Sequence, residues 1–264
     1  MALALAVGCA GPEAPALPGQ PTPVVVQNPQ PAVATNNPPR VIALAISSDR
    51  VEIGEEVTVT ATVSDDESSA DDLSYIWAAT SGTITGTGRI VKWKAPVANP
   101  TPAAFKVSLM VIDKYGLGEQ SLEHRVTAES PDIHVNDSPK EVRALSEEFI
   151  RDFATPSLSP ETCVRNFSDS CGGKRSELQD IIDNRNRFRI LSHTFTVSRV
   201  SITTGRTRAE VRGACEFRST VKATGSLEIA SGTCVLTLVN ENYRWWLCDS
   251  RMTDSNSAGL TFPF

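Results

Sequence analysis

Six cysteines are the residues of this 264-residue chain whose types and spacing point most directly to chemistry. Cys9 stands alone, and five further cysteines follow from Cys163 onward. A cysteine cluster in a short β-rich segment is typical of disulfide bonds in an oxidising compartment. Zinc is not indicated, because the sequence has no CxxC pair and no histidine close to these cysteines. We expect a first bridge between Cys163 and Cys171, which would fix the irregular link between two helices.

A second bridge is expected between Cys234 and Cys248, which flank a turn at residues 240–242. A three-residue turn places these two cysteines opposite each other on paired strands, near the separation that a disulfide needs. Cys215 is left over in this scheme. A one-residue change in the turn would instead favour a bridge between Cys215 and Cys234. Each bridge would stabilise the fold by about 2–4 kcal/mol.

The segment Ala6-Val7-Gly8-Cys9 resembles a bacterial lipobox, in which the cysteine becomes the diacylated first residue of the mature protein. The resemblance implies lipid attachment at Cys9, a signal remnant over residues 1–9, and export to the bacterial cell envelope (the outer membrane, if the organism has one). Multiple acylation at this cysteine would supply stable anchoring. An ordinary signal peptide with a chance cysteine is the alternative. Residues 10–39 are rich in proline and polar residues, which predicts a disordered, extended tether.

Residues 40–129 contain short runs of alternating apolar and polar residues, separated by glycine and proline turns. This pattern predicts an antiparallel β-sandwich with Trp77 in its core. The region resembles the polycystic-kidney-disease-type and immunoglobulin-like sandwiches of bacteria. The likeness is carried by Val51-x-x-Gly54-Glu55, Tyr75-x-Trp77, Val91-x-Trp93-x-Ala95-Pro96 and Val111-x-Asp113-x-x-Gly116. It implies a spacer or an adhesive module.

One loop of this sandwich is rich in carboxylates, and a further carboxylate lies near the end of a later strand. The residues are Asp65, Asp66, Glu67, Asp71, Asp72 and Asp113. Carboxylates from two loops can supply the six to eight oxygens that Ca²⁺ requires. A solvated acidic loop is the alternative, since the spacing shows no DxDxDG order. Calcium is the one cofactor that the sequence suggests.

After a linker at residues 130–137, residues 138–253 predict helices followed by an antiparallel sheet, an α+β arrangement. Ser138, Pro139 and Glu141 have the types and spacing of a capping box that begins a helix. The domain resembles the nuclear-transport-factor-2-like (SnoaL-like) family, which includes ketosteroid isomerases and polyketide cyclases. The likeness is carried by the Ser138–Phe153 helix, Asp180-Ile181-Ile182 and the closing strand Tyr243–Asp249. The resemblance implies a cone-shaped pocket between the helices and the sheet. We expect residues 254–264 to form a C-terminal tail.

An isomerase of this family needs a carboxylate base and an oxyanion donor inside the cone. The candidates are Asp180, Asp183, His193 and Tyr243. Surface ion pairs explain the two aspartates equally well, and His193 fits a half-buried strand position, so we expect no catalytic residues. Trp245 and Trp246 point to opposite faces of a strand. We expect one in the core or cone and the other on a contact surface; the alternative is that a helix covers one and the preceding sandwich covers the other.

These features favour a non-enzymatic, lipid-anchored envelope protein that displays binding domains. Its partners would be the membrane, through the lipid on Cys9, and a protein, a glycan or a small hydrophobic ligand. A net charge of −6 argues against nucleic acid. An exported ligand binder or isomerase-like enzyme that uses the cone, and a calcium-dependent adhesin, are the alternatives.

Overall fold

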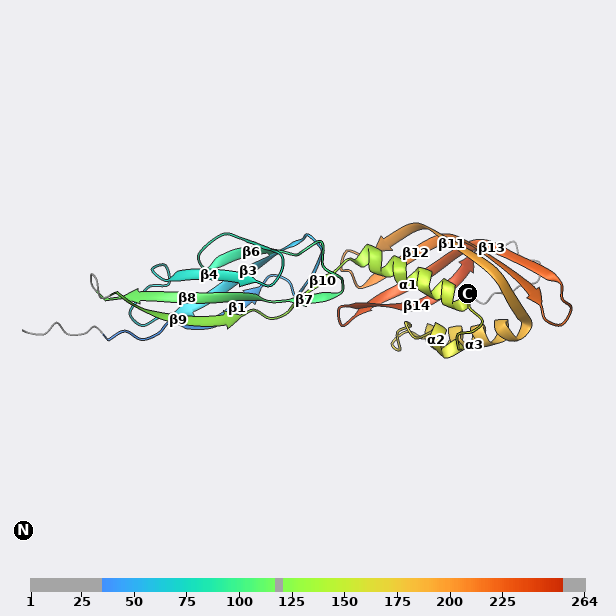
Figure 1. Ribbon diagram of the computed structural model, residues 1–264, viewed down its shortest axis with the longest axis horizontal. Helices are drawn as coiled ribbons and strands as arrows, with labels where there is room; N and C mark the ends of the chain where they lie inside the picture. Colours follow the sequence, from blue (N-terminus) through green and yellow to red (C-terminus); the bar gives the residue numbers. More distant parts are fainter. Residues whose placement is uncertain (1–34, 117–120, 254–264) are drawn as a thin grey trace, which may run out of the picture. The chain divides into compact units, whose positions relative to one another are not determined.

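Ten strands precede the first helix in the computed structural model, which describes residues 35–116 and 121–253. The lipobox with Cys9, nearly all of the tether and the tail lie outside the described residues. The strands are β1 (Arg40–Ile46), β2 (Arg50–Glu52), β3 (Glu56–Ser64), β4 (Ser74–Ala79), β5 (Thr83–Thr85), β6 (Ile90–Lys94), β7 (Ala103–Phe105), β8 (Val107–Tyr115), β9 (Leu122–Glu129) and β10 (Ile133–Asn136). They form three sheets, with strand orders β1-β3-β6-β5, β4-β8-β9 and β2-β10-β7 (Figure 1).

Two hydrophobic clusters join these sheets, because each cluster draws residues from more than one sheet. Trp93 is fully buried, and its indole nitrogen donates to the carbonyl of Ser81 at 2.9 Å. Trp77, expected in the core, is half-buried and packs against both clusters. The part is therefore β-structured as the alternation indicated. Its assignment to the polycystic-kidney-disease-type or immunoglobulin-like class stays a prediction.

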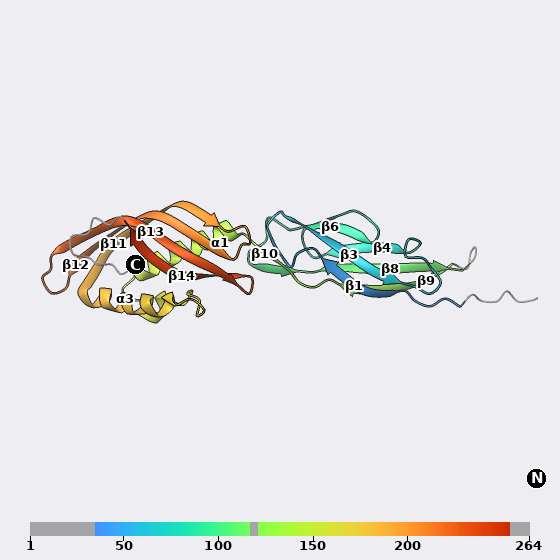
Figure 2. The ribbon, with the colours of Figure 1, turned by 180° about the vertical axis from the view of Figure 1, so that it is seen from behind.

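The C-terminal part has helices first and strands afterwards, as predicted. The elements are α1 (Ser138–Phe153), α2 (Pro160–Cys163), α3 (Gly173–Arg187), β11 (Phe188–Ile202), β12 (Arg208–Val221), β13 (Leu227–Glu241) and β14 (Arg244–Thr253). The four strands form one antiparallel sheet in the order β11-β12-β13-β14. The helices lie against one face of this sheet (Figures 1 and 2). We name this the helix-covered face and the opposite one the open face.

Helix α1 begins one residue earlier than its sequence signature suggested. Asp137 is the N-cap, and its carboxylate accepts a hydrogen bond from the backbone of Lys140 at 3.3 Å. Glu141 reaches back to the backbone N–H of Asp137 at 3.0 Å. Ser138 is not available as the cap because its N–H and hydroxyl both donate to Glu52, at 2.7 and 2.6 Å.

The segment predicted as a linker contains strand β10, which pairs in parallel with β2 and antiparallel with β7. Its last residue, Asn136, is fully buried and accepts a hydrogen bond from Arg50 at 3.1 Å. The amide of Asn136 donates to Glu141 at 2.9 Å and to the carbonyl of Tyr243 at 3.1 Å. Only one residue separates β10 from α1, so the chain passes directly from the β-structured part into the helix.

The described residues contain two disulfides, which differ from the first-choice pairs, whereas the alternative bridge between Cys215 and Cys234 is confirmed. Cys171 is bonded to Cys248, with 5.3 Å between the Cα atoms, and Cys215 is bonded to Cys234, with 5.8 Å. Cys163 is free and buried, and its thiol donates to the carbonyl of Asp152 at 3.2 Å. The predicted pairs Cys163–Cys171 and Cys234–Cys248 are therefore wrong.

The turn between β13 and β14 explains the second error. Asn242 and Tyr243 have positive φ angles of 50° and 64°, and Glu241 pairs with Arg244, so the turn has two residues rather than three. A register shift between Thr237 and Leu238 displaces the pairing of β13 with β14 by one more residue. Cys234 therefore lies opposite Met252 and not opposite Cys248.

Candidate functional site

The helix-covered face of the sheet is filled by side chains. Along β12 every second residue from Ala209 to Ser219 is buried, while the residues between them are partly or fully exposed. Aromatic rings occupy the centre of this face. The ring centroids of Phe149 and Phe167 are 5.0 Å apart, and those of Phe153 and Phe217 are 5.5 Å apart. Packed apolar side chains thus occupy the centre of the space that the family resemblance assigns to a pocket. A hollow of about 200 Å³ remains at its border, lined by Phe153, Pro156, Arg185, Phe188, Arg189, Ile190 and Lys222.

His193 is half-buried on this filled face, opposite Phe217 in the strand register. Burial lowers the pKa of its imidazole, and the nearby charge of Arg151 lowers it further. The neutral ring is therefore favoured at physiological pH. This environment is that of a strand residue at the border of the core.

Glu177 is a buried acid that the sequence reading did not single out. It lies on the inner side of α3 with 4% of its surface exposed, and the hydroxyl of Ser250 donates to one of its carboxylate oxygens at 2.8 Å. The other oxygen has no partner among the described residues. Burial raises the pKa of Glu177 to about 8, and the charges of Asp180 and Asp249 act in the same direction. The protonated form therefore prevails at neutral pH.

A sequence signal for Glu177 does exist. Glu177, Ile181 and Asn184 are four and three residues apart, which places them on one side of a helix, and all three are buried. The apolar residues of α3 alone define a weaker stripe, so the acid at the first position looked like part of the polar side.

The other catalytic candidates do not form a constellation with His193. Asp183 is exposed and accepts a hydrogen bond from Gln179 at 3.0 Å. Burial raises the pKa of the neighbouring Asp180, and the charge of Asp183 adds to this. Tyr243 donates its hydroxyl to Asp49 at 2.8 Å and stacks on His134, with 3.5 Å between the ring centroids. Tyr243 is therefore used at the junction with the β-structured part.

The acidic loop is held by local hydrogen bonds. Asp113 accepts from the hydroxyl of Ser68 at 2.8 Å, and Asp65 accepts from the backbone N–H of Ser68 at 2.7 Å. Asp71 forms an exposed ion pair with Arg89 at 3.2 Å. Within the described part of the chain, no three histidines, cysteines or acidic residues are grouped as a metal site. The carboxylates of Asp65, Asp66, Glu67, Asp71, Asp72 and Asp113 are thus not gathered into one cluster in this structure, and calcium binding stays a prediction.

The two adjacent tryptophans of β14 have different environments, as the alternation of strand residues requires. Trp245 is 1% exposed, and its indole nitrogen donates to the hydroxyl of Ser138 at 2.9 Å. Trp246 is half-buried on the open face, with the guanidinium carbon of Arg244 at 4.4 Å from its ring centroid. Trp246 pairs in register with Val239. Trp246 is thus the tryptophan that remains for a contact surface.

A hollow of about 390 Å³ lies over the end of the sheet that includes the β11–β12 turn. Its lining combines hydroxyl groups, one cation, one carboxylate and apolar side chains. The residues are Ser201, Ile202, Thr203, Arg208, Ala209, Glu210, Thr237, Leu238, Val239 and Cys248. We call this hollow the groove. Most of its polar side chains belong to the open face, because they alternate with core residues such as Ala209 and Leu238.

Arginines cross the open face beside the groove. The register aligns Arg199 with Arg212, then Arg212 with Val235, and Val235 with Arg251. We call Arg199, Arg212 and Arg251 the arginine row. The next row, from Ser201 to Asp249, includes Glu210.

Glu210 accepts a hydrogen bond from Arg212 at 2.6 Å. This bond lowers the pKa of Glu210, and the charges of Arg251 and Arg199 lower it further. Glu210 is therefore a charged acceptor at neutral pH.

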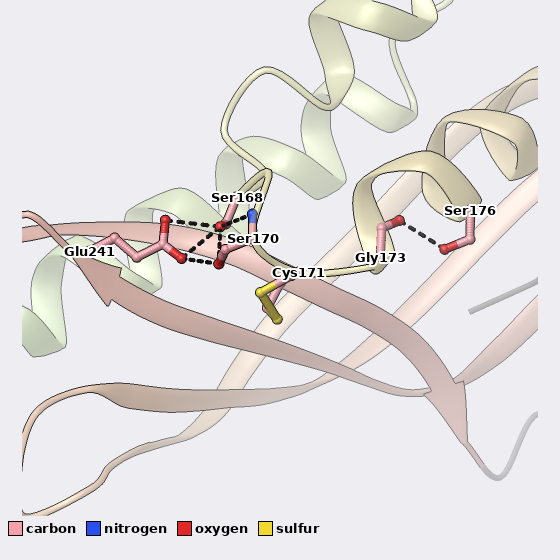
Figure 3. The surroundings of a disulfide bond; sticks show 7 residues. Ser168, Ser170, Cys171, Gly173, Ser176 and Glu241 are labelled. Atoms are coloured by element: carbon pink, nitrogen blue, oxygen red, sulfur yellow. Dashed lines mark hydrogen bonds between the residues drawn. A yellow bond between two sulfur atoms is a disulfide. The ribbon is translucent and has the colours of Figure 1, made fainter.

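The Cys171–Cys248 disulfide fixes the border of this face (Figure 3). Ser168 and Ser170 both contact the carboxylate of Glu241, and the hydroxyl of Ser168 lies 2.8 and 2.9 Å from its two oxygens. The backbone N–H of Ser168 donates to the carbonyl of Leu247 at 2.7 Å. This loop therefore covers the edge strand β14 where it would otherwise be open to pairing.

Comparisons with known proteins give neither a family nor an activity. No protein-family model matches the chain, and no curated protein matches it significantly. A ketosteroid isomerase-like protein from Erwinia carotovora atroseptica SCRI1043 is 17% identical, with a TM-score of 0.38 over 44% of this chain and 94% of that one. A protein proposed to be a scytalone dehydratase from Novosphingobium aromaticivorans DSM 12444 is 14% identical, with a TM-score of 0.37 over 46% and 88%.

Proposed function

We propose that this chain is an exported, lipid-anchored binding protein without a catalytic centre, and that its ligand site is the groove on the open face. The observation that carries the proposal is the contrast between the two faces. Packed rings fill the centre of the helix-covered face and leave a hollow of about 200 Å³ at its border, whereas the open face has a hollow of about 390 Å³ with polar and charged lining. Ligand sites of proteins commonly have volumes of 300–1,000 Å³ and a few placed polar groups.

Export is supported by the two disulfides, because such bonds persist in oxidising compartments. No helix among the described residues is long and apolar enough to cross a membrane. Lipid attachment at Cys9 rests on the lipobox resemblance and on the proline-rich tether that follows it. The nuclear-transport-factor-2-like class of the C-terminal part is part of the same proposal, supported by helices packed on one antiparallel sheet.

Intact mass of the protein extracted from membranes tests the anchoring. We expect a mature chain that begins at an acylated Cys9 and lacks four thiol hydrogens, with Cys163 alkylated only after unfolding. An unmodified chain beginning at Met1 would contradict both export and anchoring.

Hydroxyl-radical footprinting of the full chain tests the site. The probes are the polysaccharide, lipid and protein fractions of the source organism's cell envelope, each added separately. We expect one fraction to protect Trp246 and Val239 on the open face while Leu145 and Leu178 on the helices stay unchanged. Protection confined to the helices or to Ile76 of the β-structured part, or no protection by any fraction, would overturn the proposed site.

A second candidate function is proton transfer by Glu177, since a buried carboxyl with a raised pKa is the type of group that such chemistry needs. The groove is not lined by Glu177, so the binding function has the better support. Replacement of Glu177 by Gln separates the two: binding at the groove should be unchanged, whereas an enzyme of this type would lose activity.

A further inference from the structure

The chemical class of the ligand can be inferred from the charges around the groove. The open face near it has four arginines, namely Arg199, Arg208, Arg212 and Arg251, and two carboxylates, Glu210 and Asp249. The whole chain has a net charge of −6. The groove is thus bordered by a locally positive surface on an acidic protein, which favours an anionic ligand.

All four arginines are exposed. Of these four, only Arg212 forms a salt bridge with another described residue, which is Glu210. Guanidinium groups present donors in a planar fork that matches a carboxylate in two parallel hydrogen bonds. Their spacing follows the strands, with neighbouring strands about 4.8 Å apart. A row of this kind fits an extended ligand that carries more than one carboxylate.

The lining adds groups that suit hydroxyl-rich ligands. Ser201, Thr203 and Thr237 each offer a hydroxyl that can donate and accept, and Glu210 offers charged acceptor oxygens. Val239 supplies an apolar surface in the groove, and Trp246 pairs with it in the register. A sugar ring has the matching character, since it carries hydroxyls at its edge and flat apolar C–H surfaces.

We propose that the groove binds an acidic oligosaccharide, with its carboxylates on Arg208 and the arginine row and its hydroxyls on Glu210, Ser201 and Thr237. This inference rests on the proposed function, because it assigns a ligand class to the same site. An acidic peptide would also satisfy the arginines, but it lacks the ring with hydroxyls at its edge and a flat C–H surface that matches the hydroxyl lining and Val239.

Calorimetric titration of the full chain with tetragalacturonate tests the proposal. Its carboxyl-reduced form, which has the same linkages and hydroxyls but no charge, and tetraglutamate are the two comparison ligands. We expect tetragalacturonate to bind at least tenfold more tightly than either one, and its affinity to fall as salt is raised. Equal binding of the reduced form, or tighter binding of tetraglutamate, would overturn the saccharide assignment.

Two exposed arginines provide the matching variants. The double variant Arg208→Gln and Arg251→Gln should reduce the affinity for tetragalacturonate at least tenfold. Arg218→Gln is the control, because Arg218 is an exposed residue of the same strand β12, is six residues from Arg212, and does not line the groove. It should change the affinity by less than twofold. Unchanged binding by the double variant, with the near-ultraviolet circular dichroism of wild type, would overturn the proposal.

The titration and the footprinting together test the ligand class and the binding site separately. If tetragalacturonate fails to bind while an envelope fraction protects Trp246 and Val239, the open face is the binding site and the acidic-saccharide inference is wrong. If no fraction protects these residues and tetragalacturonate fails as well, both proposals are wrong.

Discussion

The two faces of the β11–β14 sheet are built from the same strands but follow opposite rules. On the helix-covered face, apolar side chains form the core, and the buried carboxyl of Glu177 is favoured in its neutral form. On the open face, arginines and carboxylates lie side by side, and Glu210 is kept charged by its neighbours. The covered face therefore contributes mainly to stability, whereas the open face carries the exposed charged groups on which the proposed binding function rests.

The largest loss of stability is expected when an aromatic ring is removed from the helix-covered face. Phe217→Ala should lower the free energy of unfolding by about 3–5 kcal/mol, because a fully buried aromatic side chain leaves a cavity. Thr237→Ala on the open face is the control and should cost less than about 1 kcal/mol. Urea denaturation measures both values, and similar losses at the two positions would contradict the division between the faces.

The two disulfides are expected to stabilise the protein by different amounts. Replacing both Cys171 and Cys248 by alanine should destabilise the protein by about 1 kcal/mol more than replacing Cys215 and Cys234. The reason is the loop that each bond closes, since the paired cysteines are 77 and 19 residues apart. Thermal unfolding with and without reductant is the measurement, and the opposite order would show that chain entropy does not govern these bonds.

Glu177 makes the stability of the covered face depend on pH. Its pKa in the folded state is about 8, above the ordinary value near 4.5, so the folded state holds a proton that the unfolded chain has lost. Its contribution is fully present below pH 4.5 and disappears as pH rises to 8, at up to about 1.4 kcal/mol per pH unit. We expect the free energy of unfolding to fall by about 3 kcal/mol between pH 5 and pH 8.

Glu177→Gln should remove most of this decline, because the amide does not titrate. Asp183→Gln, at an exposed position on the same helix, is the control that should keep it. A wild-type protein whose stability is constant over this range would show that Glu177 is ionised in the folded state.

The smallest effect is expected for the arginines of the open face. Arg199→Gln should change the free energy of unfolding by no more than about 0.5 kcal/mol, since the side chain is exposed and forms no salt bridge with another described residue. Urea denaturation of the Arg199→Gln variant measures this change. A loss comparable to that of Phe217→Ala would mean that the open face is structural rather than free for a ligand.

Local patterns in the sequence predicted the order and type of elements in the C-terminal part. The bounds Ser138–Phe153 follow from an apolar stripe with helical spacing, and the strands follow from alternation. The length of a turn and the position of a β-bulge are harder to predict from the sequence. The turn at Asn242 and Tyr243 is one residue shorter than expected, and this with the register shift after Thr237 was enough to misassign Cys234.

The candidate site was harder to predict than the fold. The arginine row exists only after the register of four strands is known, because Arg199, Arg212 and Arg251 are separated by 13 and 39 positions in the chain. Glu177 carries a helical-spacing signal, but its polar type outweighs that signal in a sequence reading. Strand alternation predicted that Trp245 and Trp246 lie on opposite faces, but only the structure shows that Trp246 is the one on the open face.

Strand β10 has a practical consequence for dissecting the chain. Residues 130–137 are the natural place to cut if they are read as a linker. Such a cut would take β10 away from between β2 and β7, and would expose their backbone hydrogen-bonding groups. It would also leave Glu52 and Arg50 without their partners Ser138 and Asn136. A fragment of the β-structured part therefore has to extend through residues 133–141, and a fragment that ends before β10 is expected to aggregate.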